Sequence, residues 1–262
     1  MISAALKWLL MALMSVMIIA VFMTSSPMSE AKALVTGDVS VDPAKIYRIM
    51  YFHVPQAITA TLAFIMAMAF ALAYLAKRDI KYDIYSFRAN QCGMLFAILA
   101  LLTGIIFARY TWGFWWDWSE VRMTSMLVLT LMYGGYFSLR SSIADRDKRA
   151  ALSAVMSCLF TLAGVFLMFV VPRIAASRHP TDSIVDSSGS LTMSTNVGLI
   201  FFASVLSFIG LFIWIWRVSS RLSLLELKRE RKSTAKSGVL PRIVEAPAAA
   251  SPTAPAGGGA GS

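Results

Sequence analysis

The chain has 262 residues, of which 58% are hydrophobic and only 15% are charged. This composition departs from that of soluble globular proteins, so the apolar runs decide the class of protein before the length does. A formal net charge of +10 would suggest a nucleic-acid partner for a soluble protein, but the distribution of the basic residues argues against that partner.

About 20 apolar residues cross the hydrocarbon core of a bilayer as one helix. Six stretches have this length: 8–26, 51–76, 91–108, 123–140, 151–171 and 197–217. We therefore predict an all-α integral membrane protein with a six-span membrane domain over residues 1–217. Behind it we expect a basic juxtamembrane segment at 218–236, which suits anionic lipid headgroups, and a disordered tail rich in Ala, Pro and Gly at 237–262.

The basic residues are distributed unevenly over the segments between these runs. Most of the 24 Lys and Arg residues lie near the N-terminus, in the 77–88 and 140–149 loops, or in the tail. By the positive-inside rule, the N-terminus and the tail are then cytoplasmic. The 27–48 loop, the 172–195 loop and the loop between the third and fourth spans would face the periplasm or exterior. We expect a multi-pass protein of the cytoplasmic membrane.

The first apolar run is consistent with two interpretations. It follows Lys7 and precedes Ser-Glu-Ala-Lys-Ala at 29–33, which resembles a signal-peptide cleavage site. The run is long for a signal peptide, so we expect a first helix that is retained. Either choice leaves residue 34 onward on the outside.

The second span begins near His53, one of two histidines in the chain. This histidine lies at the predicted outer mouth of the span. Pro55 either begins the regular helix, where its missing N–H has no partner to lose, or kinks the helix near the histidine. On its own, His53 suits haem ligation, metal ligation or a hydrogen-bonded place at the interface.

Four of the seven tryptophans fall between the third and fourth spans, at Trp112, Trp115, Trp116 and Trp118. The first three are spaced i, i+3 and i+4, so a short interfacial helix would gather their rings on one face; an outward-facing loop is the alternative. Tryptophan is common at membrane surfaces, but four in so short a segment exceed that enrichment. A flat, polarisable ligand that stacks on the indoles is the interpretation we favour.

The second histidine, His179, follows the fifth span. Both histidines fall on the predicted outer side, and they flank the tryptophan segment in sequence. Two neutral imidazoles are a natural axial pair for haem iron. Guanidinium groups pair with carboxylates bidentately, and we select Arg48 and Arg122 as candidate partners of the two haem propionates.

These residues carry a family resemblance that covers about residues 40–217. The tryptophan segment is similar to the WWD signature of haem-handling cytochrome c assembly proteins, and it reads Trp112-Gly113-x-Trp115-Trp116-x-Trp118 and then Arg122-x-Thr124-Ser125. The start of the second span resembles that of the CcmC branch, haem exporter protein C, and it reads Arg48-Ile-Met-Tyr-x-His53-Val-Pro55. Two features depart from the family pattern. Glu120 stands near the place of the family aspartate, and Ala175 and Ala176 replace tryptophans that often precede the second histidine.

The resemblance implies that His53 and His179 are the axial ligands of a non-covalently and transiently bound haem b. It implies that the tryptophan segment holds the porphyrin, through Trp112, Gly113, Trp115, Trp116 and Trp118. Haem would then pass to a membrane-anchored chaperone of the CcmE type. An ATP-binding cassette transporter (CcmA and CcmB type) and a small membrane subunit (CcmD type) would share the complex, and this chain would not be an enzyme.

Two other functional classes remain open at this point. One is a synthetase-type haem lyase that attaches haem to apocytochrome c, although such relatives carry more spans and more histidines. The other is a transporter of a non-haem solute, although the predicted spans lack the acidic residues of proton-coupled transporters. Asp117 and Glu120 are candidates for orienting a partner or a helix terminus rather than for acid–base catalysis, because no nucleophile accompanies them.

Overall fold

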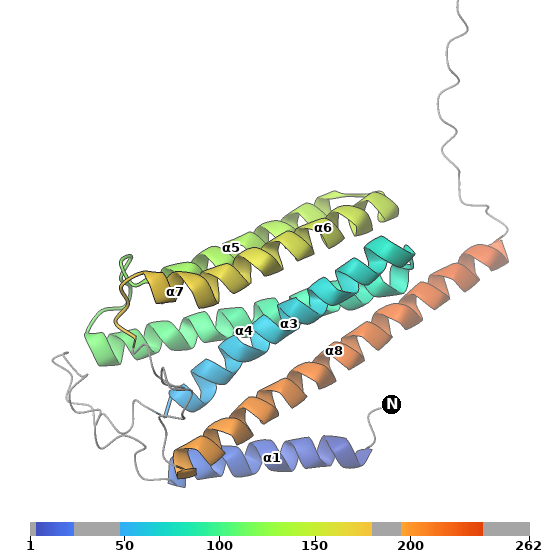
Figure 1. Cartoon of the computed structure of the whole chain (residues 1–262). Helices are drawn as coiled ribbons and strands as arrows, with labels where there is room; N and C mark the ends of the chain where they lie inside the picture. Colours follow the sequence, from blue (N-terminus) through green and yellow to red (C-terminus); the bar gives the residue numbers. More distant parts are fainter. Residues whose placement is uncertain (1–3, 24–47, 180–194, 238–262) are drawn as a thin grey trace, which may run out of the picture. The chain divides into compact units, whose positions relative to one another are not determined.

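The computed structural model describes residues 4–23, 48–179 and 195–237, and all regular secondary structure in these residues is helical. The helices are α1 (Ala4–Met23), α3 (Met50–Lys77), α4 (Ile80–Trp112), α5 (Val121–Ser142), α6 (Arg146–Val165), the π-helical segment η2 (Phe166–Val170), α7 (Val171–Ile174) and α8 (Thr195–Ser237) (Figure 1). The predicted all-α class is confirmed. The chain divides into two compact units after Leu224, and the features described below lie in the first unit.

Five helical stretches in the described residues are long and apolar enough to cross a membrane. They are Ala5–Met23, Met50–Lys77, Ile80–Trp112, Arg146–Ile174 and Thr195–Thr234. The predicted span 123–140 falls on α5, which is outside this set because Thr, Ser, Tyr and Gly residues interrupt its apolar sequence. Helix α5 nevertheless packs against α4 and α6, so each predicted span coincides with a helix. The membrane topology stays a prediction.

Helices α3 and α4 form the most extensive helix pair, and the turn between them is short. Arg78 adopts a left-handed conformation with φ of 53°, which ends α3. Asp79 then caps α4 by accepting a hydrogen bond from the backbone N–H of Lys81 at 3.0 Å. The predicted loop at 77–88 is therefore wrong beyond residue 79. The charged stretch stays helical because a partner from α5 neutralises its buried carboxylate, Asp83.

That partner is Arg140, which was predicted to lie at the start of the cytoplasmic loop 140–149. Its guanidinium donates two hydrogen bonds of 2.7 Å to the carboxylate of Asp83, and the two side chains are only 11% and 8% exposed. The contact brings the start of α4 and the end of α5 to the same end of the bundle. The two loops predicted to be cytoplasmic thus lie together, whichever side of the membrane they face.

Proline 55 lies inside α3 rather than at its start, because the helix begins at Met50. A proline has no N–H to donate to the carbonyl four residues before it. In this protein the hydroxyl of Ser204, on α8, donates to that carbonyl, which belongs to Tyr51. The proline thereby frees an acceptor that ties α3 to α8 two residues before His53.

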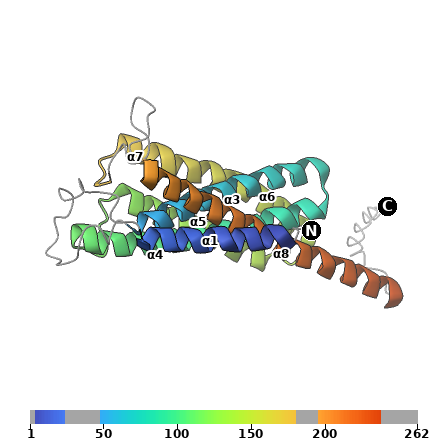
Figure 2. The same cartoon turned by 90° about the horizontal axis from the view of Figure 1, so that it is seen from below.

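Helix α1 and the part of α8 up to Leu224 complete the first unit. Met17 and Val21 of α1 are buried in the main hydrophobic core, and Leu10 packs against Gly210 of α8. Figure 2 shows the same helices from below. Helix α8 continues without a break from the sixth predicted span into the basic 218–236 segment. The cleavage-like sequence at 29–33 and nearly all of the predicted tail lie outside the described residues.

Candidate functional site

His53 lies at the end of the first turn of α3 and is half-buried against α4. Its Nδ1 atom is 3.0 Å from the hydroxyl of Thr103. That hydroxyl donates its one proton to the backbone of its own helix, with the carbonyl of Leu99 at 2.8 Å. Nδ1 is therefore the donor to Thr103, and the lone pair of the neutral ring lies on Nε2. Gly104 makes room for the ring, because a Cβ at that position would lie 2.9 Å from His53 Cε1.

His179 follows α7, and its side chain is 23% exposed. Its Nδ1 atom is 3.2 Å from the Oε1 atom of Glu120. An ionised carboxylate can only accept a hydrogen bond, so this Nδ1 also carries the proton and leaves the lone pair on Nε2. The ring of Trp112 meets the imidazole edge-on, with ring centroids 4.8 Å apart and planes at 77°.

The two histidines lie along the same face of α4. His53 packs on Gly104, and the ring centroid of His179 is 6.4 Å from that of Phe107. Residues three apart in a helix share a face and are separated by about 4.5 Å along the axis. The structure thus brings together two side chains that are separated by more than half of the described chain.

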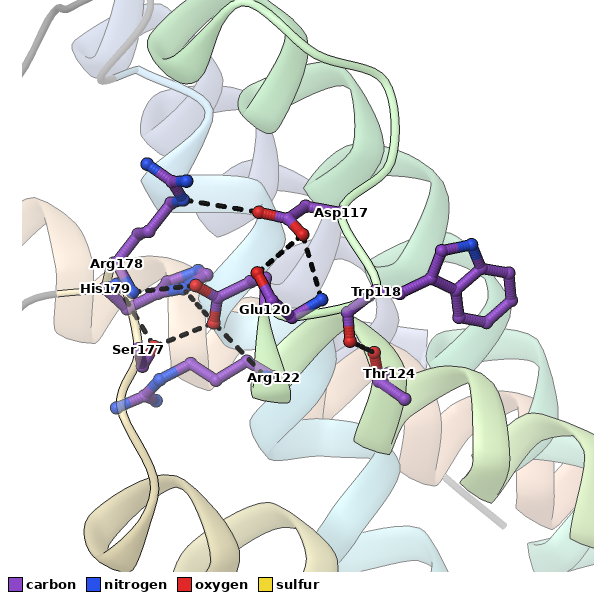
Figure 3. A network of polar contacts seen from close by, with 9 residues as sticks. Asp117, Trp118, Glu120, Arg122, Thr124, Ser177, Arg178 and His179 are labelled. Atoms are coloured by element: carbon purple, nitrogen blue, oxygen red, sulfur yellow. Dashed lines mark hydrogen bonds and ion pairs between the residues drawn. The ribbon is translucent and has the colours of Figure 1, made fainter.

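Glu120 is the centre of a polar network at this end of the bundle, and its side chain is fully buried (Figure 3). Besides His179, it accepts hydrogen bonds of 2.7 Å from the hydroxyl of Ser177 and from the backbone N–H of Arg178. It also caps α5 by accepting from the backbone N–H of Arg122 at 3.2 Å. Burial by itself raises the pKa of Glu120, but the hydrogen bonds from His179, Arg178 and Ser177 outweigh it and lower the pKa from 4.5 to about 2. The predicted orienting role of this acid fits these contacts.

The tryptophan segment is a loop, and the short helix considered above is not formed. Helix α4 ends at Trp112, and Gly113 has φ of 85°, a left-handed conformation that commonly ends helices. From there to the start of α5 the chain follows turns and irregular structure. The i, i+3, i+4 spacing of the indoles therefore does not place them on one helical face.

The indoles instead form separate groups. Trp116 and Trp118 pack edge to face, with centroids 5.4 Å apart and planes at 68°. Trp115 lies under the guanidinium of Arg109 and is 59% exposed, and Trp118 is 72% exposed. Trp112 is the indole in contact with His179. The single flat platform expected from the sequence is therefore replaced by one indole beside the imidazoles and three farther along the loop.

Three buried N–H groups near this end are without a hydrogen-bond partner among the described residues. They are Nε of Arg48, Nε of Arg122 and Nε1 of Trp116. A buried donor without an acceptor costs free energy, so such groups commonly belong to a site whose ligand supplies the acceptor. By contrast, Arg178 is paired with Asp117 at 3.4 Å. The two arginines selected from the sequence thus retain donors that suit a carboxylate.

Sequence reasoning missed Thr103, Gly104 and Ser177. The Thr-Gly pair was a weak signal, since small residues in an apolar span mark the close approach of another element without saying which one. Ser177 gave no signal, because its partner Glu120 lies 57 residues away.

Comparison with known proteins gives a consistent result. A family model described as "CcmC: Heme exporter protein C" matches residues 2–236. The chain is 35% identical to "Heme exporter protein C" of Rhodobacter capsulatus over 49% of this chain and 51% of the relative. It is 30% identical to the protein of the same name from Haemophilus influenzae over 71% of this chain and 74% of the relative. It is 29% identical to that from Bradyrhizobium diazoefficiens over 68% and 66%. The chain spans about half the length of the first of these relatives and more of the other two.

Proposed function

Because the chain belongs to the Heme exporter protein C family, we propose that it binds haem between His53 and His179 and delivers it for cytochrome c maturation. The observation that carries this proposal is that both imidazoles lie along one face of α4, each with Nδ1 as a hydrogen-bond donor. Both Nε2 lone pairs are then available, and neutral imidazole nitrogen is a common axial ligand of haem iron.

The remaining groups of the site match the rest of a haem molecule. Haem is flat and apolar around its ring, and Trp112 already contacts one of the two imidazoles. Its two propionates are carboxylates, and Arg48 and Arg122 hold buried Nε donors without an acceptor. We assign the propionates to these two arginines, with Trp116 as a further donor. The other indoles, Trp115 and Trp118, are exposed and would cover the outer edge of the ring.

The direction of haem handling follows from the orientation predicted for the bundle. The end of the bundle that contains Asp83 and the basic loops is predicted to lie in the cytoplasm. The end that contains the two histidines then faces the periplasm or exterior of the cytoplasmic membrane. Haem would be handed there to a membrane-anchored chaperone of the CcmE type. The CcmA and CcmB type transporter subunits and the CcmD type small subunit would be the other members of the complex. In this function the chain carries haem and catalyses no bond formation.

The test is the optical spectrum of the purified full-length protein with haem. We expect the low-spin Soret and visible bands of a haem with two nitrogen ligands, and we expect them to disappear in the double variant His53→Ala, His179→Ala. The variant Arg149→Ala, at the opposite end of the bundle, serves as the matched purification control. A double variant with the wild-type spectrum would contradict the ligand assignment. Thioether formation on an apocytochrome by this chain alone would instead favour a lyase.

A further inference from the structure

The two proposed ligands differ in the group that holds each ring, and this difference has chemical consequences. Nδ1 of His179 donates to a carboxylate, Glu120, whereas Nδ1 of His53 donates to a neutral hydroxyl, Thr103. A hydrogen bond to an ionised acceptor is roughly twice as strong as one between neutral groups. It also shifts electron density toward Nε2, which makes that nitrogen a stronger donor to a metal.

We propose that Glu120 makes His179 the retained ligand of the haem and leaves His53 as the ligand that is exchanged when haem is handed on. This inference rests on the proposed function and concerns how the same site works. Glu120 is a positioning residue in this account, because it acts through the imidazole and does not itself touch the haem.

The surroundings of Glu120 support this role. The carboxylate is fully buried and accepts from several donors, so its place relative to His179 is fixed by two segments of the chain, the start of α5 and residues 177–179 (Figure 3). One of these donors is the backbone N–H of Arg178, the residue next to His179. The carboxylate thereby holds both the ring and the backbone that carries it. Each group that faces the carboxylate donates to it, so the imidazole proton lies on Nδ1.

His53 is held in a different way. Its ring rests in the space left by Gly104, and its Nδ1 atom donates to a hydroxyl that also bonds to the backbone of α4. Steric fit orients this ring without adding negative charge behind it. The iron–nitrogen bond on this side is therefore the weaker one, and the incoming ligand of a haem acceptor replaces it first. In that exchange the Nε2–iron bond of His53 breaks and the acceptor's lone pair forms the new bond, with no change in oxidation state.

The test uses the full chain loaded with haem and measures two quantities. One is the midpoint potential of the haem, and the other is the rate of haem loss to apomyoglobin as a scavenger. The variant Glu120→Gln removes the charge behind His179 and leaves the side chain nearly the same size. We expect the potential to rise, because a weaker donor stabilises ferric iron less, and haem loss to be about 10–100-fold faster.

The matched control is Asp117→Asn, which removes one negative charge from the same loop. Asp117 bonds to Ser119 and pairs with Arg178, and it does not contact the imidazole in the described contacts. We expect both quantities to stay near the wild-type values. Equal shifts of the potential in the two variants would overturn the proposal, because the effect would then be one of net charge. His179→Ala should also lose haem faster than His53→Ala, and the reverse order would overturn the proposal.

A second variant covers the case in which Glu120→Gln does not fold. Ser177→Ala leaves the carboxylate in place and removes one of the donors that compete for its Oε1 atom. We expect the potential to fall, in the direction opposite to that for Glu120→Gln, and a rise would overturn the proposal. Wild-type protein without a low-spin haem spectrum would reject the proposed function itself. A wild-type spectrum with no response to these variants would reject only the role of Glu120.

Discussion

Among the described residues, each end of the bundle buries one carboxylate, and the partners of these two carboxylates differ. At one end, Asp83 receives two 2.7 Å hydrogen bonds from Arg140, whose guanidinium also lies 4.3 Å from the ring centroid of Phe87. At the other end, Glu120 receives hydrogen bonds from an imidazole, a hydroxyl and backbone N–H groups. The first carboxylate is neutralised by a permanent cation, whereas the second holds a ring whose other nitrogen remains available.

This difference separates a structural charge from a functional one. The Asp83–Arg140 pair ties α4 to α5 at the end opposite the tryptophan loop. The Glu120 network ties the tryptophan loop to the segment after α7, and it leaves Nε2 of His179 available to a ligand. A buried acid therefore indicates a binding site when its partner is an imidazole whose second nitrogen can bind a ligand. It indicates a structural contact between helices when its partner is an arginine that donates two hydrogen bonds to it.

The largest effect on stability should come from breaking the structural pair. Arg140→Ala leaves the carboxylate of Asp83 buried without a counter-charge, and breaking a buried pair in this way costs about 3–5 kcal/mol. Thermal unfolding in detergent would measure the loss. Arg146→Ala, which removes an exposed arginine from the same end, should change stability little. Equal stability of the two variants would show that Asp83 is not buried as described.

A smaller effect should follow from crowding His53. Gly104→Ala places a Cβ 2.9 Å from the present position of His53 Cε1, so the ring must move. An added methyl in a packed position costs about 1–3 kcal/mol, and we expect haem binding to weaken by about tenfold or more. Gly134→Ala, with nothing within 4 Å of its Cβ, is the matched control. Haem titration of both variants would measure the two affinities. Unchanged haem affinity in Gly104→Ala would show that the haem does not bind beside His53.

The smallest effect should come from the neutral hydrogen bond to His53. Thr103→Val keeps the side-chain shape and removes the acceptor of the imidazole proton. The loss is about 1 kcal/mol, or roughly fivefold in haem affinity, because a neutral hydrogen bond contributes little net free energy. Thr130→Val, whose hydroxyl bonds only to its own helix at Met126 in the described contacts, controls for the substitution. If Thr103→Val weakened haem binding as much as Glu120→Gln does, the proposed difference between the two histidine ligands would be contradicted.

Much of the bundle could be predicted from the sequence, since runs of apolar residues alone fix where helices of this length occur. The helix boundaries could not be predicted, because α4 extends through a charged stretch that only a partner from another helix neutralises. Asp83 looked like part of a solvated loop until Arg140, 57 residues later, was placed beside it.

The candidate site could likewise be predicted only in part. The two histidines and the tryptophan loop were visible as rare residue types that lie at the predicted outer ends of the spans or between them. The arrangement of the indoles was not visible, because a single left-handed glycine, Gly113, ends the helix that the spacing of the tryptophans would otherwise favour. Nor could the sequence alone choose between Asp117 and Glu120, since that choice depends on which acid meets the segment after α7.

The most direct test of the account is pulsed electron paramagnetic resonance of the ferric, haem-loaded protein with its histidines labelled with ¹⁵N. Two histidines exist in the chain, so every labelled nitrogen coupled to the iron comes from one of them. We predict a low-spin signal coupled to two histidine nitrogens, with one coupling lost in each of the single variants His53→Ala and His179→Ala. A high-spin signal in the wild-type protein, or both couplings surviving in either variant, would contradict the claim that the two imidazoles share one iron.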